Sequence, residues 1–439
     1  MIDNVTIIGA GLTGLSAAFH LKEAGIGYRV FEKESEPGGM CRSVYERGFT
    51  FDYTGHLLHI HEKDILRWVK RVLKGKLNTR HRKAFIYSFG RLTPYPFQVH
   101  THGLPPRIVD DCVCGFIEAY CKRMKQREVG IENFYQWILY YFGRGVAKHF
   151  MVPYNRKLWT LHPRNLTRDW LGNYVPSPSL REVLHGAAGL EKKEYGYNVH
   201  FYYPEQGGIQ CLVNAIASKL EHLYCRHTLY RIDLKRRAIY FSNGEKKYYE
   251  FLLSTIPLPE LIYSCLDQIP PGIREAAEKL KCSSVFNINL GIDRPLISSF
   301  HWIYFPEKEF IFYRVGFPEN FSRRMVPSEK SSLYVEVGYS PWRPLPPNIR
   351  KRVRQGLIKA GILRTSREIV CENILDLKYA YVTYDRHRNA AVSAIQDFLQ
   401  SKNIYSGGRY GAWEYSTMED AMACGRRFVE RLKRGLNAG

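Results

Sequence analysis

The segment 5–39 constrains the fold more than any other part of the sequence. It begins with a short β-branched run that predicts a buried strand at Val5–Ile8, and a helix pattern follows. A second strand pattern ends at Glu32. Between the first strand and the helix lie three spaced glycines, Gly9, Gly11 and Gly14. A dinucleotide-binding βαβ unit requires this order of strand, glycine turn, helix, strand and acid, so we predict a Rossmann-like unit at this end of the chain.

Each residue type in this unit has a physical reason. Gly9 allows a tight turn, Gly11 lets backbone amides approach a pyrophosphate, and Gly14 lets the helix close on the strand. The helix N-terminus offers N–H groups and the positive end of its dipole to phosphates. Glu32, which follows Gly14 by 18 residues, is placed to accept hydrogen bonds from an adenosine ribose. An ordinary βα turn is the alternative for a glycine triplet alone, but the complete context favours a dinucleotide site.

The residues after the second strand distinguish the possible cofactors. An acid at the end of that strand argues against a 2′-phosphate, which leaves an NAD-like ligand or FAD. The segment Glu36–Ser43 contains a second glycine pair, Gly38–Gly39. It resembles a segment of the flavin-dependent amine-oxidase-like superfamily, whose backbone passes close to the flavin diphosphate. We therefore expect FAD as the cofactor.

The charge of the chain bears on its partners. The 439 residues carry a formal net charge of +22, which is high enough to consider nucleic acid or an anionic membrane. The basic residues are spread along the chain, and no nucleic-acid module or aromatic platform accompanies the basic clusters. We expect no nucleic-acid partner. A solvated basic surface is the simplest interpretation, and attraction to anionic substrates or to a membrane face stays open.

Cysteine spacing and hydrophobic run lengths bear on the compartment. The ten cysteines show no CxxC pair and no zinc-type spacing, so we expect reduced structural thiols and no metal. No basic segment precedes the first apolar run, and no apolar stretch reaches the roughly 20 residues that span a bilayer. We expect a cytoplasmic protein without a transmembrane segment.

Hydrophobic periodicity divides the rest of the chain. A helical pattern over 106–150 predicts an inserted domain, and antiparallel strand patterns follow at 232–251. A strand at 252–257 and a strand, glycine turn and helix at 403–432 are predicted to return to the cofactor domain. The predicted fold class is α/β: a Rossmann-like, GR2-type FAD-binding domain with an inserted helical domain and an antiparallel-sheet substrate domain. The expected boundaries are 1–100 with 205–285 and 395–439 for the first, 101–204 for the second and 286–394 for the third.

A set of short motifs follows in order along nearly the whole chain. The most selective motifs are PYNRKLW at Pro153–Trp159 and GRYGAW at Gly408–Trp413. The others are Gly38–Gly39, Phe51–His56 (FDYTGH), Tyr304–Glu307 (YFPE) and Phe312–Arg314 (FYR). On composition alone, residues 150–159 are equally compatible with a packed hinge. In their order along the chain, the motifs resemble those of UDP-galactopyranose mutases, especially the eukaryotic-type branch and its prokaryotic relatives.

The resemblance implies an enzyme that interconverts the pyranose and furanose forms of a UDP-sugar, with UDP-galactose as the first choice. In that family reduced FAD is the active form: its N5 atom attacks the anomeric carbon, UDP leaves, and the flavin N5–sugar adduct opens and recloses without net oxidation. This chemistry needs cations and tyrosines for the diphosphate and a sugar carbon held in line with N5. The implied partners are the nucleotide-sugar substrate and a reductant, either NAD(P)H or a reductase. The oligomeric state is left open.

The resemblance also assigns roles residue by residue. Arg314, which faces the sugar diphosphate, and His56, on the loop under the flavin, are the expected catalytic residues. The expected substrate-binding residues are Tyr304, Tyr381, Tyr415, Trp159, Asn155 and Tyr174. The expected cofactor-binding residues are Gly9, Gly11, Leu12, Thr13, Gly14, Glu32, Lys33, Gly38, Gly39, Met40, Cys41, Arg42, Gly55, His56, Arg409, Glu414 and Met418.

Two positions depart from the family pattern. Tyr174 stands where the family has an arginine in a Trp-x-x-x-Arg-Val segment, and losing such a charge-assisted contact costs about 1–3 kcal/mol. Either Arg181 compensates for the missing charge or the substrate differs. The family's Tyr-Pro pair is Tyr381–Val382 here. Fold and cofactor are unaffected by these changes, and the exact sugar nucleotide is what they leave open.

Two other functions share the predicted fold. An oxidase or dehydrogenase of the protoporphyrinogen-oxidase or amine-oxidase kind takes hydride from its substrate into oxidised flavin. A flavin-bearing scaffold that binds an anionic surface without turnover is the third hypothesis. Arg314 and the three expected phosphate-binding tyrosines favour the mutase, because an apolar amine or a porphyrinogen needs no such set.

Overall fold

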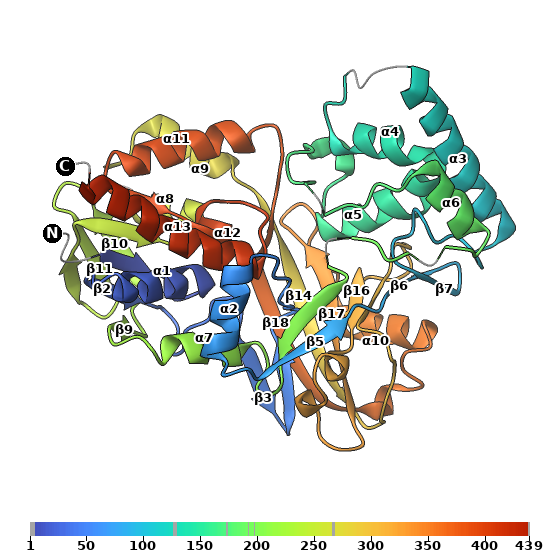
Figure 1. The fold of residues 1–439 in the computed structure, drawn as a ribbon, viewed down its shortest axis with the longest axis horizontal. Coiled ribbons are helices and arrows are strands. Elements are labelled where there is room, and N and C mark those ends of the chain that lie inside the picture. The colour runs from blue at the N-terminus through green and yellow to red at the C-terminus, as the bar shows by residue number, and fades with distance from the viewer. Residues whose placement is uncertain are drawn as a thin grey trace.

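Two large sheets, of five and seven strands, organise the chain (Figure 1). The computed structural model describes residues 5–125, 130–172, 174–191, 193–196, 198–265 and 268–437. The outer ends of the predicted first domain, residues 1–4 and 438–439, lie outside these ranges. Both ends of the described chain lie beside the five-stranded sheet in Figure 1.

The five-stranded sheet is parallel throughout. Its order is β19 (Ile404–Ser406), β13 (Phe251–Ser254), β1 (Val5–Ile8), β2 (Tyr28–Phe31) and β9 (Leu223–Tyr224). Every residue of the central strand β1 is buried, as its continuous apolar run predicts for a strand covered on both faces. The predicted strands of the βαβ unit are confirmed. The predicted return of the segments at β13 and β19 to this sheet is confirmed as well.

Helices from distant parts of the sequence cover this sheet (Figure 1). Those that share one hydrophobic core with β1 and β2 are α1 (Leu12–Glu23), α2 (Lys63–Val72), α7 (Gln210–Ala217) and α13 (Met418–Asn437). The last helix begins at a reciprocal cap, in which Thr417 Oγ1 accepts from Asp420 N at 3.2 Å and Asp420 Oδ2 accepts from Thr417 N at 2.8 Å. The predicted helix after residue 417 is therefore confirmed, with Thr417 as its cap. The other helices on this side are α8 (Leu258–Ser264), α9 (Pro271–Lys279) and α11 (Arg388–Gln400).

The seven-stranded sheet is antiparallel except where β15 runs parallel to β6. Its order is β18 (Ile369–Val382), β14 (Cys282–Ile292), β17 (Ser331–Tyr339), β16 (Arg314–Gly316), β15 (Trp302–Tyr304), β6 (Ala84–Ser88) and β7 (Arg91–Pro94). Helix α10 (Ile349–Lys359) buries Val353 and Leu357 against it. Strands β6 and β7 join this sheet although they belong to the expected segment 1–100. The three-domain division stays a prediction.

A group of helices lies at the end of the molecule away from the termini (Figure 1). It contains α3 (Pro106–Lys125), α4 (Phe134–Val146), a π-helical turn at Ala147–Met151, α5 (Val152–Leu158) and α6 (Leu180–Ala187). Glycines let α3 and α4 cross closely, because a Cβ at Gly143 would lie 1.9 Å from the carbonyl oxygen of Gly115. The helical pattern predicted over 106–150 is confirmed at 106–125 and from 134 onward, and residues 126–129 of that range lie outside the described residues. The motif at Pro153–Trp159 forms α5, with its proline in the first turn.

Smaller sheets and one short α-helix lie outside these groups. They are the hairpin β3 (Ser43–Glu46) and β4 (Phe49–Asp52), the pair β5 (Leu77–His81) and β8 (His200–Pro204), the antiparallel sheet β10 (Leu229–Asp233), β11 (Ala238–Phe241) and β12 (Lys246–Tyr248), and the short helix α12 (Gly408–Gly411). All ten cysteines are free thiols. Among the described residues, no cluster of three or more His, Cys, Asp or Glu side chains is arranged to hold a metal ion. Within the same residues, none of the helices combines the length and apolar character needed to span a bilayer.

Candidate active site

One cavity of about 870 Å³ extends from the β1–α1 turn to the seven-stranded sheet. It therefore connects the predicted dinucleotide site with the predicted substrate residues. The expected residues that line it are Gly9, Gly11, Leu12, Thr13, Glu32, Lys33, Gly38, Gly39, Met40, Cys41, Arg42, Gly55, His56, Tyr304, Arg314, Tyr381, Arg409, Tyr415 and Met418. The tertiary structure thus brings residues from both ends and the middle of the chain into the lining of one cavity.

At the first end of the cavity, two glycines form a backbone cradle. Gly11 precedes α1 with an extended conformation (φ −73°), and no side chain caps the helix N-terminus there. A Cβ at Gly11 would meet its nearest neighbour, the Gly39 Cα, at 4.0 Å. Since both glycines line the cavity, a side chain on Gly11 would occupy space that an anion approaching the helix N-terminus needs.

Glu32 is held in place at the end of β2. Its side chain is only 5% exposed, Oε2 accepts from Ala10 N at 2.7 Å, and Oε1 accepts from Glu34 N at 3.1 Å. The carboxylate thus fixes the turn after β1 and still lines the cavity. A carboxylate in this position fits a ribose diol, which donates two hydroxyl hydrogens.

Glu32→Gln is expected to weaken FAD binding about tenfold, and Glu32→Ala more strongly, because a hydrogen bond to a charged group contributes about 1.5–3 kcal/mol. Glutamine keeps the size of the side chain and one acceptor oxygen, but its NH2 group faces one of the two turn N–H groups, so its effect combines the ribose contact with one turn contact. Flavin fluorescence on titration of the deflavinated protein measures both affinities. Unchanged FAD affinity in both variants would show that Glu32 holds only the turn.

At the other end of the cavity, an arginine and a glutamate form a bidentate ion pair across two strands. Arg314 on β16 lies opposite Glu336 on β17, with Nε to Oε2 at 2.5 Å and Nη2 to Oε1 at 2.7 Å. The Glu336 side chain is 1% exposed, and that of Arg314 is 18% exposed. Although burial alone lowers it, the Glu336 charge raises the pKa of Arg314 well above its usual value. The pair accounts for two of the five N–H donors of the guanidinium.

Tyrosines surround this ion pair. Tyr304, Tyr381 and Tyr415, all expected from the sequence, line the cavity, and Tyr381 stacks on Tyr415 at 6.0 Å between ring centroids. Burial raises the pKa of Tyr381 and of Tyr415, so both hydroxyls stay protonated and able to donate. A cluster of hydroxyl donors beside a guanidinium suits phosphate oxygens.

His56 and Arg409 also line the cavity. Nδ1 of His56 is 3.2 Å from Thr54 Oγ1, and burial together with the charges of Arg409 and Arg314 lowers the pKa of His56 to about 4. The imidazole is therefore neutral near pH 7. Arg409 donates to Ser416 O at 2.5 Å and to Ala380 O at 2.9 Å, and its guanidinium carbon lies 5.0 Å from the Tyr415 ring centroid.

Five of the expected residues do not line the cavity: Gly14, Asn155, Trp159, Tyr174 and Glu414. Gly14 packs on the turn of Gly9, and Asn155 is occupied internally, because it accepts from Trp159 Nε1 at 3.1 Å and donates to Met151 O at 2.8 Å. Trp159 is 1% exposed and lies behind Tyr381, with ring centroids 5.7 Å apart.

The other two also lie outside the lining. Tyr174 sets its ring edge-on to Tyr415, with centroids 4.8 Å apart. The backbone N–H of Glu414 donates to Arg409 O at 2.9 Å, and burial raises the pKa of its carboxyl. These residues can act on a ligand only through the residues that line the cavity, and their direct binding roles stay predictions.

The structure adds lining residues that sequence reasoning did not single out. They include Tyr53, Tyr154, Thr255, Tyr313, Tyr334 and Glu336. Tyr154 lies inside the PYNRKLW motif and Tyr313 precedes Arg314, so motif membership was a usable signal for both. Glu336 has no such signal, because only the pairing of β16 with β17 places it opposite Arg314.

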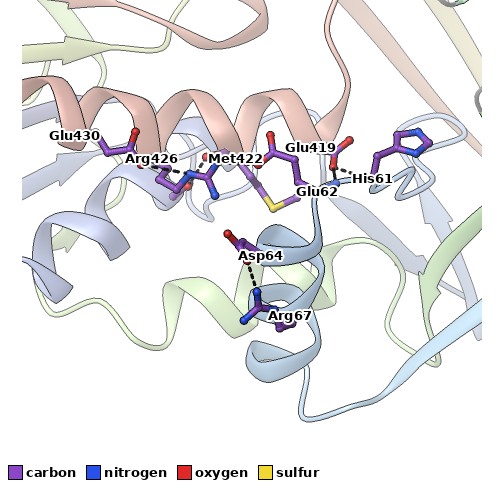
Figure 2. A network of polar contacts seen from close by, with 9 residues as sticks. His61, Glu62, Asp64, Arg67, Glu419, Met422, Arg426 and Glu430 are labelled. Carbon is purple, nitrogen blue, oxygen red and sulfur yellow. Dashed lines mark hydrogen bonds and ion pairs between the residues drawn. The ribbon is translucent and has the colours of Figure 1, made fainter.

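A polar clasp ties the segment after His56 to the start of α13 (Figure 2). Oε1 of Glu419 accepts from the backbone N–H groups of His61 at 2.7 Å and of Glu62 at 2.6 Å. Arg426 donates to Glu62 at 2.7 Å and lies 3.6 Å from Glu430. Since Met418 at the start of α13 also lines the cavity, the clasp joins two parts of the cavity wall that are far apart in sequence.

The sequence profile of the flavin containing amine oxidoreductase family matches residues 12–433. The chain belongs to this family, and the family implies FAD as its cofactor. The glycine cradle, the anchored Glu32 and the open helix N-terminus fit that group at the first end of the cavity.

Among solved structures, the chain is similar to reduced UDP-galactopyranose mutase, with a TM-score of 0.91 and 29% identity over 99% of this chain and 96% of that one. It also resembles a putrescine oxidase structure with bound putrescine in fold, with a TM-score of 0.68 and 15% identity over 98% of this chain and 99% of that one. The suspected likeness to a mutase-type flavoprotein is confirmed.

Local sequence matches have different names. A hydroxysqualene dehydroxylase of Sinorhizobium fredii is 45% identical over 60 residues, which are 13% of this chain and 14% of that protein. A mitochondrial protoporphyrinogen oxidase of Nicotiana tabacum is 41% identical over 61 residues, 14% of this chain and 12% of that protein. The chain thus matches about one seventh of the length of these relatives.

Proposed function

We propose that the protein is a sugar-nucleotide mutase that depends on reduced FAD and interconverts the pyranose and furanose forms of a UDP-sugar, UDP-galactose first. The observation that carries this proposal is the polar end of the cavity. Arg314 and the tyrosines Tyr304, Tyr381 and Tyr415 face the same space as the cofactor residues. An anionic diphosphate fits this set, and a 29% identical mutase structure that spans the whole fold supports the proposal.

Bound reduced flavin supplies a nucleophilic nitrogen, and the chain's own residues position the substrate for it. The guanidinium of Arg314 holds the diphosphate as it becomes the leaving group, and Glu336 fixes the plane of the guanidinium through its two hydrogen bonds. The protonated hydroxyls of Tyr381 and Tyr415 donate to phosphate oxygens. His56 stays neutral, so it adds no charge to the cavity near pH 7.

The position of Tyr174 bears on the identity of the sugar nucleotide. Its ring supports Tyr415 rather than lining the cavity, so no second arginine enters the diphosphate end from this point. In the proposed enzyme the lining arginines Arg314 and Arg409 provide positive charge for the diphosphate. The proposal also requires a reductant, NAD(P)H or a reductase, as a partner.

A second candidate is an FAD-dependent oxidoreductase of the protoporphyrinogen-oxidase or amine-oxidase type. The names of the local sequence matches and the putrescine oxidase fold support it. In that case the substrate would reduce the bound flavin directly. The polar, tyrosine-rich end of the cavity is the feature that argues against this candidate.

An anaerobic assay separates the two functions. Purified protein with bound flavin is mixed with UDP-galactofuranose, with and without dithionite, and UDP-galactopyranose is followed by chromatography. We expect conversion only when the flavin is reduced. Flavin reduction by an amine or a porphyrinogen, with no conversion of any UDP- or dTDP-sugar, would support the oxidoreductase instead.

A further inference from the structure

Lys157 is a buried lysine whose three acceptors are all backbone carbonyls. Its side chain is 5% exposed, and Nζ donates to the carbonyl oxygens of Phe305 at 2.7 Å, Glu307 at 2.6 Å and Phe312 at 3.1 Å. An ammonium group has three N–H donors, so these bonds satisfy it completely. Burial lowers the pKa of Lys157 to about 7, with Arg343 acting in the same direction and Glu307 and Glu309 opposing it.

The three carbonyls belong to the irregular loop 305–313, which connects β15 to β16. The loop closes through Phe305 N to Tyr313 O at 2.9 Å and is buried through the side chains of Phe305, Phe310 and Phe312. Buried carbonyls outside regular structure need partners, and each one left without a partner costs about 1–3 kcal/mol. Lys157 therefore supplies a donor to Phe305 O and to Phe312 O, and a second donor to Glu307 O, which also accepts from Phe310 N at 3.2 Å within the loop.

The residues that flank this loop are functional candidates. Tyr304 ends β15 and Arg314 begins β16, and the two are paired in register across the hairpin. Both line the cavity, whereas Lys157 lies behind it. On the same helix α5, Tyr154 lines the cavity and lies 5.3 Å from the Tyr304 ring. Helix α5 thus contacts this part of the site from the front through Tyr154 and from behind through Lys157.

We propose that Lys157 is the positioning residue that holds the β15–β16 hairpin, and with it Tyr304 and Arg314, at the sugar-nucleotide end of the cavity. The identity of the ligand in this inference rests on the proposed function. The fixing of the loop by α5 is independent of the proposed function. The ammonium acts on the ligand through the loop carbonyls. A displacement of about 1 Å in the residues that position a substrate can cost about 100-fold in rate.

The test uses Lys157→Met, with Lys359→Met as a matched control. Lys359 pairs with Glu309 on the same loop, but it does so at the surface, where it is 61% exposed. Hydrogen–deuterium exchange followed by mass spectrometry measures the protection of residues 304–314 in both variants with FAD bound. We expect residues 304–314 to exchange about tenfold faster in Lys157→Met than in the unsubstituted protein. In Lys359→Met we expect their exchange rate to stay unchanged. Unchanged exchange in Lys157→Met would overturn the proposal.

A binding measurement tests the link to the ligand. UDP-galactose is titrated into the oxidised proteins, which do not turn it over if the proposed function is correct. We expect Lys157→Met to bind it about tenfold or more weakly with FAD affinity unchanged, because the hairpin carries only the sugar-nucleotide contacts. If FAD affinity fell to the same extent and exchange rose throughout the chain, Lys157 would have a general structural role and the proposal would be wrong.

Two further arms keep the outcomes distinct. If Lys157→Met does not fold, Lys157→Gln, which keeps two N–H donors, replaces it and is expected to show the same local change to a smaller degree. If the unsubstituted protein binds neither UDP-galactose nor UDP, the proposed function fails. The exchange result on residues 304–314 then still decides whether Lys157 positions the hairpin.

Discussion

Arg314→Ala is expected to lower kcat/KM by about 1000-fold or more, while the protein keeps its FAD. Removing one partner of a buried, hydrogen-bonded charge pair costs about 2–5 kcal/mol, and the lost guanidinium is also the expected diphosphate contact. The residue lies at the end of the cavity opposite the glycine cradle, so the flavin site is unchanged. Turnover assays and the flavin absorbance of the purified variant measure the two effects.

The ion pair with Glu336 complicates this experiment in a predictable way. Alanine at position 314 leaves the Glu336 carboxylate, which is 1% exposed, without its ion-pair partner. Part of any loss of turnover therefore reflects destabilisation of the protein. The double variant Arg314→Ala with Glu336→Gln also removes the unpaired charge of Glu336. We expect the double variant to recover the Tm but not the turnover. Recovery of both, or loss of flavin from the single variant, would contradict the assignment of Arg314 to the substrate.

Gly14→Ala is expected to destabilise the cofactor domain strongly. A Cβ at this position would lie 2.0 Å from the carbonyl oxygen of Gly9 and 3.3 Å from Ile7 Cγ2, so α1 would have to move away from β1. Overpacking of this kind costs about 1–3 kcal/mol or more, and here the clash is with backbone that has no alternative rotamer. We expect a lowered Tm for the protein already stripped of flavin, measured by circular dichroism.

Gly11→Ala is the matched control and is expected to behave differently. Its Cβ would meet no atom closer than 4.0 Å, and its φ of −73° is allowed for any residue, so the Tm of the flavin-free protein should change little. The added methyl group lies in the cavity at the helix N-terminus, and FAD affinity should fall about tenfold or more. Equal FAD affinity for Gly11→Ala and the unsubstituted protein would show that the diphosphate does not pass Gly11.

Local patterns predicted much of the architecture correctly. The β1–α1–β2 unit followed from β-branched runs and glycine spacing, because the turn requirements act within a few residues. The antiparallel strands at 232–251 and the helix at the end of segment 403–432 followed from local hydrophobic periodicity for the same reason. The sheet that β6 joins was not evident from local patterns, because its partner β15 is more than two hundred residues away, and β7 follows through its pairing with β6.

The candidate site was only partly predictable. The resemblance indicated Arg314, His56, Tyr304, Tyr381 and Tyr415, and these line the cavity, whereas Tyr174 does not. Membership of a motif did not say which way a side chain faces. Trp159 donates a hydrogen bond to Asn155 behind the tyrosines. Lys157 of the same motif donates to the carbonyl oxygen of Phe305, 148 residues away in the sequence. The docking of α5 on the seven-stranded sheet decides these directions.

The sequence by itself determined the class of cofactor domain, since the glycines and Glu32 act through short-range backbone geometry that few other residues allow. Only the tertiary structure decided how the polar end of the cavity is built. It paired Arg314 with Glu336 by strand register, gave Lys157 three carbonyl partners, and tied the segment after His56 to α13 through Glu419. These contacts depend on long-range packing of sheets and helices, and no local pattern of residues records which partners that packing brings together.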